Sequence, residues 1–270
     1  MKTRILAAVV LLPLLLLVVL ALPNIYTAVL FGLLSAIAAY ELMWGTGLVK
    51  KPRLLVYAAV FAFLMPVWCY FGMPYLYGLL GVLVFVSALY AEVLASHGKL
   101  PYSQITVTLA AGLLVPFLFT ALVRIHGMEN GRLYILIPFV MAFMSDTGAY
   151  FVGCAFGKHK LAPVISPKKS VEGVFGGVAG AIIGMLLFCL VVSFAFDKEV
   201  NYLYAAIYGL AGSLAAVFGD LSFSAIKRQV GIKDYGNLIP GHGGVLDRFD
   251  SMTLVAPLAE VLLLMIPVVM

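Results

Sequence analysis

The sequence predicts an all-α integral membrane protein, and three of its features support this fold class. Of the 270 residues, 64% are hydrophobic and only 11% are charged. The mean hydropathy is +1.11, whereas a soluble domain is nearer half apolar and a quarter charged. The apolar residues are also gathered into long runs. We therefore expect lipid rather than water to solvate most of the surface.

Each predicted span is an apolar run of roughly 20 residues, the length that crosses a hydrocarbon core about 30 Å thick. About nine such runs follow one another, at residues 4–22, 24–44, 54–71, 74–95, 103–123, 133–157, 172–196, 202–225 and 251–270. The first run resembles a secretory signal peptide, but its apolar part exceeds the usual length of roughly 7–15 residues, and further spans follow. We expect it to be a retained first helix.

The positions of Lys and Arg predict the direction of the spans, because cytoplasmic loops carry an excess of both residues. With a cytoplasmic N-terminus and nine spans, fourteen of the 17 basic residues fall on the cytoplasmic side, and the remaining three are Arg124, Arg132 and Lys198. We therefore expect the C-terminus on the opposite side of a cytoplasmic (inner) membrane. This distribution accounts for the net charge of +5 without nucleic acid, which is not an expected partner.

We expect a single polytopic membrane domain, residues 1–270, whose two parts differ in chemistry. Residues 1–130 have short loops with few polar groups and are expected to form a helical scaffold. Residues 131–270 contain three polar segments and two cytoplasmic loops, 158–172 and 226–250. We expect this second part to be the catalytic half.

The first polar segment, residues 145–150 (Ser-Asp-Thr-Gly-Ala-Tyr), places the carboxylate of Asp146 inside a run long enough to span. An ionisable side chain at that depth is costly in lipid, so we expect Asp146 to face the protein interior or a wet cavity and to be functional. The alternative is a helix–helix hydrogen bond through Asp146 and Thr147.

The second polar segment, residues 166–173 (Ser-Pro-Lys-Lys-Ser-Val-Glu-Gly), is a basic loop before a helix. Lys168, Lys169 and Ser170 stand just before the helix N-terminus, where free N–H groups and the helix dipole favour an anion. Taken alone, the two lysines are better explained as anchors at the cytoplasmic surface. The glycines that follow, between residues 173 and 184, predict close helix packing.

The third polar segment, residues 219–250, begins on a helix. Asp220, Ser224 and Lys227 lie on one helical face, because steps of four and seven residues return near the same angle. Arg228 follows directly. This face joins a carboxylate to cations near the cytoplasmic surface.

The rest of that segment is a loop and a helix start. After Lys233 and Asp234, residues 240–244 read Pro-Gly-His-Gly-Gly, and such glycines let a backbone approach a ligand and present N–H groups to phosphate oxygens. Asp247 and Asp250 then share a face at the start of the last helix, where Asp250 alone is also explained as an N-cap.

Carboxylates beside lysines and arginines at a membrane surface favour metal-assisted phosphoryl or nucleotidyl transfer. Mg²⁺ takes one or two carboxylates and leaves its other positions to water and substrate phosphates. Such transfer needs little more than positioned groups, a metal on the phosphate oxygens and cations to neutralise charge. The depth of Asp220 suggests that one substrate is a lipid phosphate.

These motifs resemble the signature of the phosphatidate cytidylyltransferases, also called CDP-diacylglycerol synthases. The similarity is in Ser-Ala-Ile-Lys-Arg at 224–228, Lys-Asp at 233–234, Pro-Gly-His-Gly-Gly at 240–244 and Asp-Arg-Phe-Asp at 247–250. The segments SDTGAYFVG and SPKKSVEG also look like features of the family, so the resemblance covers roughly residues 140–255. The first 130 residues agree only in hydropathy and number of spans.

The resemblance implies the reaction of CTP with phosphatidate to give CDP-diacylglycerol and pyrophosphate, with a divalent metal such as Mg²⁺, a site that can hold a second cation, and often a homodimer. It points to Asp220 and Asp247 as metal ligands, and we add Asp146 and Asp250 as candidates. Asp250 could instead orient Arg248 or cap the helix. We expect the following residues to act on the substrates: Lys227, Arg248 and His242 in catalysis, and Lys168, Lys169, Ser170, Ser224, Arg228, Lys233, Gly243 and Gly244 in binding.

Two other functions fit part of this pattern. A transporter or cation channel would also place Asp146, Asp220 and Glu260 in membrane helices, but it would not require a Gly-His-Gly-Gly loop between two acidic clusters. Another lipid-directed transferase, such as a CTP-dependent polyprenol kinase, would transfer the γ-phosphate and leave CDP. Structural hydrogen bonding is the default explanation for Glu41, Glu92 and Glu260.

Overall fold

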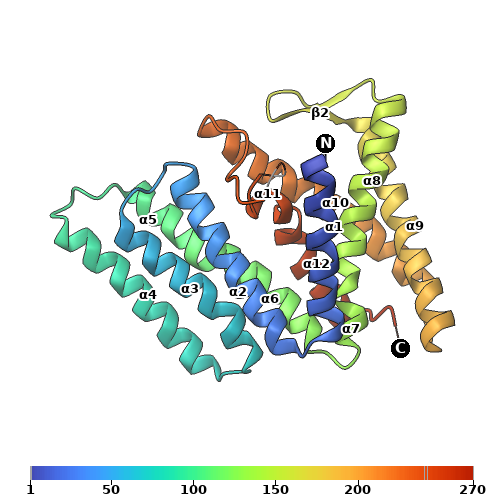
Figure 1. The fold of residues 1–270 in the computed structure, drawn as a ribbon, viewed down its shortest axis with the longest axis horizontal. Helices are drawn as coiled ribbons and strands as arrows, with labels where there is room; N and C mark the ends of the chain where they lie inside the picture. The colour runs from blue at the N-terminus through green and yellow to red at the C-terminus, as the bar shows by residue number, and fades with distance from the viewer. Residues whose placement is uncertain (1, 240, 242, 270) are drawn as a thin grey trace. The chain divides into compact units, whose positions relative to one another are not determined.

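The computed structural model describes residues 2–239, 241 and 243–269, most of which are helical (Figure 1). The elements in chain order, with π-helical segments labelled η, are α1 Lys2–Leu16, η1 Leu17–Ala21, α2 Asn24–Tyr40, η2 Glu41–Gly45, α3 Pro52–Tyr70, α4 Tyr75–Ala95, α5 Tyr102–Leu109, η3 Ala110–Leu114, α6 Val115–His126, α7 Gly131–Tyr134, α8 Leu136–Phe156, β1 Lys160–Ala162, β2 Ser166–Ser170, α9 Val171–Phe196, α10 Tyr202–Gln229, α11 Leu246–Phe249 and α12 Met252–Met265. The predicted all-α membrane fold is confirmed.

Seven helices in the described part of the chain are long and apolar enough to cross a membrane. They are Asn24–Gly45, Pro52–Tyr70, Tyr75–Ala95, Tyr102–His126, Gly131–Phe156, Val171–Phe196 and Tyr202–Gln229. They coincide with the second to eighth predicted spans. The first run is the shorter apolar helix Val9–Ala21, and the last is α12, with 14 residues. The total of nine spans and the direction of the chain stay predictions.

The chain divides into two compact units. The N-terminal unit comprises Met1–Arg132 and Val230–Phe249, and the C-terminal unit comprises Leu133–Gln229 and Asp250–Met270. The segment with the glycine-rich loop, which the sequence led us to group with the C-terminal half, thus belongs with the first helices. The reason is that this segment forms hydrogen bonds with η2, and α11 packs against α2 and α6.

The N-terminal unit is a helical bundle in which α2 packs against α3 and α6, and η3 packs on α3. Its buried core contains small residues such as Ala58 and Ala62 beside the large rings of Phe31 and Phe119. Phe249 of α11 makes edge-on contacts with both rings, at centroid distances of 6.3 Å to Phe31 and 6.0 Å to Phe119. Contacts of the partly exposed Phe249 ring with two buried rings therefore anchor α11 to the first helices.

In the C-terminal unit α8 and α9 lie side by side (Figure 1), and α10 packs on α9 and α12. The glycines of α9 permit the close approach, as predicted. A Cβ at Gly180 would lie 2.6 Å from the Met144 carbonyl oxygen and 3.0 Å from the Cα of Gly148. Only hydrogen fits there, because real Cβ atoms do not come so near to backbone.

The loop between α8 and α9, predicted as a basic loop, contains a small antiparallel hairpin. Its register pairs Lys160 with Ser170 and Ala162 with Ser166, with an irregularity between the pairs. Pro163 begins the turn after β1, and Pro167 is tolerated in β2 because a two-stranded sheet leaves one edge of each strand unpaired. The hairpin gives Lys168 and Lys169 fixed positions on β2.

Candidate active site

A polar cavity of about 470 Å³ adjoins the glycine-rich loop in the N-terminal unit. The residues that line it are Lys233, Asp234, Asn237, Ile239, Gly241, Gly243 and Arg248. Two of the predicted binding residues, Lys233 and Gly243, thus share one cavity with the predicted catalytic Arg248. His242 lies outside the described residues.

The backbone of this loop turns back on itself. The Ile239 N–H donates to the Gly243 carbonyl at 2.9 Å, and Gly241 and Gly243 have φ angles of 75° and 88°. Residues other than glycine rarely adopt these left-handed φ angles. The glycines of the motif are therefore required by the shape of the turn.

The carboxylate of Asp247 hydrogen-bonds the backbone on both sides of the glycine-rich turn. Its Oδ2 atom accepts the N–H of Tyr235 at 2.8 Å and the N–H of Gly244 at 3.0 Å. Asp247 is 8% exposed. The Gly244 N–H, which we expected to face a substrate phosphate, donates to the protein's own carboxylate in this structure.

The carboxylate of Glu41, at the start of η2, accepts the next two N–H groups. Val245 donates to Glu41 Oε1 at 2.9 Å and Leu246 donates to Oε2 at 2.8 Å. Gly244 lies so close that a Cβ there would come within 2.5 Å of three atoms of this carboxylate. Glu41 and Asp247 together therefore bond three consecutive N–H groups, those of residues 244–246.

In the C-terminal unit, α10 places a carboxylate beside cations. Ser224 Oγ donates to Asp220 Oδ1 at 3.1 Å, which confirms that the two residues share a helical face. Lys169 of β2 forms an ion pair with Asp220. Lys227, about two turns beyond Asp220 on α10, is buried. The hairpin thus brings a predicted binding lysine onto a predicted metal ligand.

Asp250 is buried near the same group of charges. Its pKa is raised to about 7, chiefly by burial and next by the negative charge of Asp220. The Ser251 N–H and Lys227 lower the pKa, and Asp146 adds to the rise. Asp146, which we expected to face the interior or a wet cavity, is exposed. Two predicted metal ligands, Asp146 and Asp220, therefore both raise the pKa of a third, Asp250.

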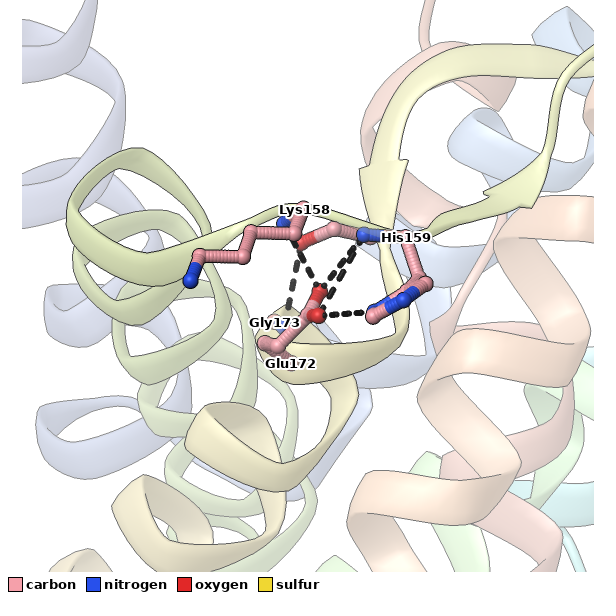
Figure 2. Close-up of polar contacts among 5 residues, drawn as sticks. Lys158, His159, Glu172 and Gly173 are labelled. Atoms are coloured by element: carbon pink, nitrogen blue, oxygen red, sulfur yellow. Dashed lines mark hydrogen bonds and ion pairs between the residues drawn. The ribbon is translucent and has the colours of Figure 1, made fainter.

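The hairpin that carries Lys169 is bonded at its base by Glu172 (Figure 2). The Glu172 carboxylate accepts the backbone N–H of Lys158 at 3.1 Å and that of His159 at 3.2 Å, and it lies 2.6 Å from His159 Nδ1. Ser170 is the N-cap of α9, since its Oγ accepts the Gly173 N–H at 3.1 Å. These bonds fix both ends of the hairpin.

The other two predicted binding residues of this unit have different surroundings. Arg228 donates through Nε to the Ile165 carbonyl at 3.2 Å, so it joins α10 to the hairpin turn. Lys168 is exposed. The structure therefore separates the two adjacent lysines, because alternate residues of a strand point to opposite faces.

The carboxylates suit a hard divalent cation, although they do not enclose one. Among the described residues, no three His, Cys, Asp or Glu side chains form a cluster that could hold a metal ion. The pKa of Asp250 is raised chiefly by burial and next by the negative charge of Asp220, and a cation with oxygen ligands would offset that second cause.

The structural hydrogen bonding expected for Glu41 is confirmed, but its partners were not predicted. Glu172 has no predicted role. The available signals were an acidic residue at the end of an apolar run and an acidic residue in the first turn of a helix. Neither signal identifies the groups that these carboxylates bond, because the bonding partners come from other segments of the chain.

Comparisons with known proteins agree with this chemistry. A model of the cytidylyltransferase family matches residues 2–266. Proteins named phosphatidate cytidylyltransferase are 44% identical over 136 residues in Staphylococcus epidermidis (50% of this chain, 51% of the relative) and 42% identical over 150 residues in Staphylococcus aureus (56% of this chain, 55% of the relative). The chain spans about half the length of the curated relatives it matches.

Proposed function

The chain belongs to the cytidylyltransferase family, and on this premise we propose that it is a phosphatidate cytidylyltransferase. It would transfer CMP from CTP to phosphatidate, giving CDP-diacylglycerol and pyrophosphate. The relatives with this name support the proposal. The observation that carries it is the polar cavity at the glycine-rich loop, which is lined by Lys233 and Arg248.

The cavity suits the phosphates of a nucleotide. Its volume of about 470 Å³ is within the usual range of ligand sites, roughly 300–1,000 Å³. Arg248 offers a planar fork of donors to phosphate oxygens, and Lys233 adds a second positive charge. Asn237, which was not among the predicted residues, can supply a neutral donor.

The reaction needs no protein nucleophile. A phosphate oxygen of phosphatidate attacks the α-phosphorus of CTP, a new P–O bond forms, and the bond from the α-phosphorus to the β-bridging oxygen breaks. Pyrophosphate carries away the electron pair. Because the phosphate monoester is already anionic at pH 7, no strong base is required. Lys227, Arg228 and Arg248 would neutralise charge on the phosphates.

Magnesium is part of the proposal, and Asp220, Asp250 and Asp146 would hold it. When bound, Mg²⁺ would neutralise phosphate charge and act as a Lewis acid. Asp247 is a further candidate ligand, and its two backbone bonds give it a fixed position. Lys169, now paired with Asp220, would be able to turn to a substrate phosphate once a cation neutralised that carboxylate. A second cation and a homodimer stay predictions.

The protein has the composition and helices of a multi-pass membrane protein. We propose that it lies in the bacterial cytoplasmic membrane with its active site facing the cytoplasm. The distribution of basic residues supports this direction. It would place the cavity where CTP is available and phosphatidate headgroups are within reach.

The test is an assay of purified protein in detergent with phosphatidate, Mg²⁺ and CTP labelled at the α-phosphate. We expect label in a lipid product together with release of pyrophosphate, and loss of both in Asp247→Asn. Asp197→Asn is the matched control, because Asp197 is exposed and asparagine tolerates its φ of 51°. Label recovered only as CDP would favour a kinase, and CTP left intact would favour a transporter.

A further inference from the structure

Glu41 is a buried carboxylate that the proposed reaction does not use. It stands 204 residues before its first bonding partner, Val245, and it is 2% exposed. A carboxylate is costly to bury unless hydrogen bonds compensate. Here both oxygens accept backbone N–H groups of the segment that carries the candidate nucleotide site.

The surroundings of Glu41 are built to hold this arrangement. A Cβ at Gly236 would come within 2.6 Å of Glu41 Oε1, and one at Gly244 would come within 2.5 Å. The loop therefore encloses the carboxylate from two directions. Glu41 also begins the π-helical segment η2, and π-turns are frequent at functional sites.

The bonded N–H groups lie shortly before Arg248. Leu246 is the first residue of α11, and the Arg248 N–H donates back to the Val245 carbonyl at 2.9 Å. Fixing residues 245 and 246 thus fixes the start of the short helix from which Arg248 lines the cavity. The other carboxylate, Asp247, bonds the preceding N–H of Gly244.

From these contacts we infer that Glu41 is a positioning residue for the nucleotide site: it bonds the Val245 and Leu246 N–H groups and so holds Gly243 and Arg248 where they line the cavity. This inference rests on the proposed function for the identity of the ligand. Glu41 acts through the backbone and does not touch CTP. The N-terminal helices are then more than a scaffold, because one of them sets the shape of the loop.

The test compares Glu41→Gln with Glu92→Gln. Glu92 is an acidic residue of α4 in the same unit, and its carboxylate accepts from Tyr57 at 3.3 Å and pairs with Arg53 at 3.6 Å, both residues of α3. In Glu41→Gln one charge-assisted bond is lost, because the amide nitrogen cannot accept an N–H. We expect the KM for CTP to rise by about tenfold or more, the KM for phosphatidate to stay within about twofold, and Glu92→Gln to match the wild type.

Hydrogen exchange of the substrate-free protein gives a readout independent of turnover. Exchange of the Val245 and Leu246 amides should quicken in Glu41→Gln while the amides of α3 and α6 are unchanged. If Glu41→Gln does not fold, Glu41→Asp serves instead, since it keeps the charge but shortens the reach. Unchanged exchange and an unchanged KM for CTP would overturn the inference. If the wild type neither binds nor consumes CTP, the proposed function fails, whereas the exchange result still decides whether Glu41 holds the loop.

Discussion

The ion pair between Lys169 and Asp220 predicts a measurable loss of stability in Lys169→Met. The two side chains are 25% and 28% exposed, so the pair lies between an exposed pair, at about 0–1 kcal/mol, and a buried pair, whose breakage costs about 3–5 kcal/mol. We therefore expect a loss of about 1–2 kcal/mol. At about 2–4 °C per kcal/mol for a chain of this size, the Tm should fall by about 2–8 °C.

The assay is thermal unfolding in detergent with EDTA present, so that no divalent cation compensates for the lost charge. Lys168→Met is the matched control, because Lys168 is the neighbouring residue on β2 and is exposed. Its effect should stay within about 0.5 kcal/mol, as for other exposed surface substitutions. Equal melting temperatures for the two variants would refute the reasoning.

A double-mutant cycle with Asp220→Asn isolates the pair itself. If the ion pair is the cause, Lys169→Met should have little effect in the Asp220→Asn background, and the coupling energy should be about 1–2 kcal/mol. A coupling near zero would mean that the lysine stabilises the hairpin through other contacts. Asp220→Asn would also remove a like charge from the neighbourhood of Asp250, so the single variants must be measured alongside the double variant.

Three further predictions follow from the site. Gly244→Ala should abolish activity, because its Cβ would lie 2.5 Å from the Glu41 carboxylate, whereas Gly78→Ala, with nothing within 4 Å, should retain activity in the same assay. Arg248→Ala should raise the KM for CTP by roughly 10–100-fold, which corresponds to the loss of one charged hydrogen bond of about 1.5–3 kcal/mol; an unchanged KM would remove Arg248 from the nucleotide site. Asp250→Asn should raise the Tm in EDTA and reduce activity, because it removes a buried charge beside other carboxylates; a lower Tm would show that the carboxylate stabilises the metal-free fold.

The membrane fold could be predicted because hydropathy is a local property. Seven predicted runs are helices long enough to span, and their lengths follow from the thickness of the bilayer. The hairpin at Lys160–Ser170 was not predicted, since its strands have only three and five residues and no regular alternation of apolar side chains. Short elements of this kind depend on the helices at their ends.

The candidate site was predicted in part. Spacing placed Asp220 and Ser224 on one face, and the glycine motif indicated a turn, because both inferences need only a few consecutive residues. We expect Gly244 to present its N–H to a substrate phosphate, and this stays a prediction; in this structure the N–H donates to Asp247. A residue type indicates which hydrogen bonds a group can make, whereas the folded structure decides which group it bonds.

The sequence by itself determined that this chain is a helical membrane protein with a cytidylyltransferase signature, because composition, run length and motif spacing are written along the chain. Only the tertiary structure decided that Lys169 pairs with Asp220 and that Glu41 bonds a segment 204 residues away. The Glu41 carboxylate, which is 2% exposed, would be costly to bury alone. The partners of both carboxylates come from remote segments because packing of the apolar helices, rather than local sequence, brings those segments together.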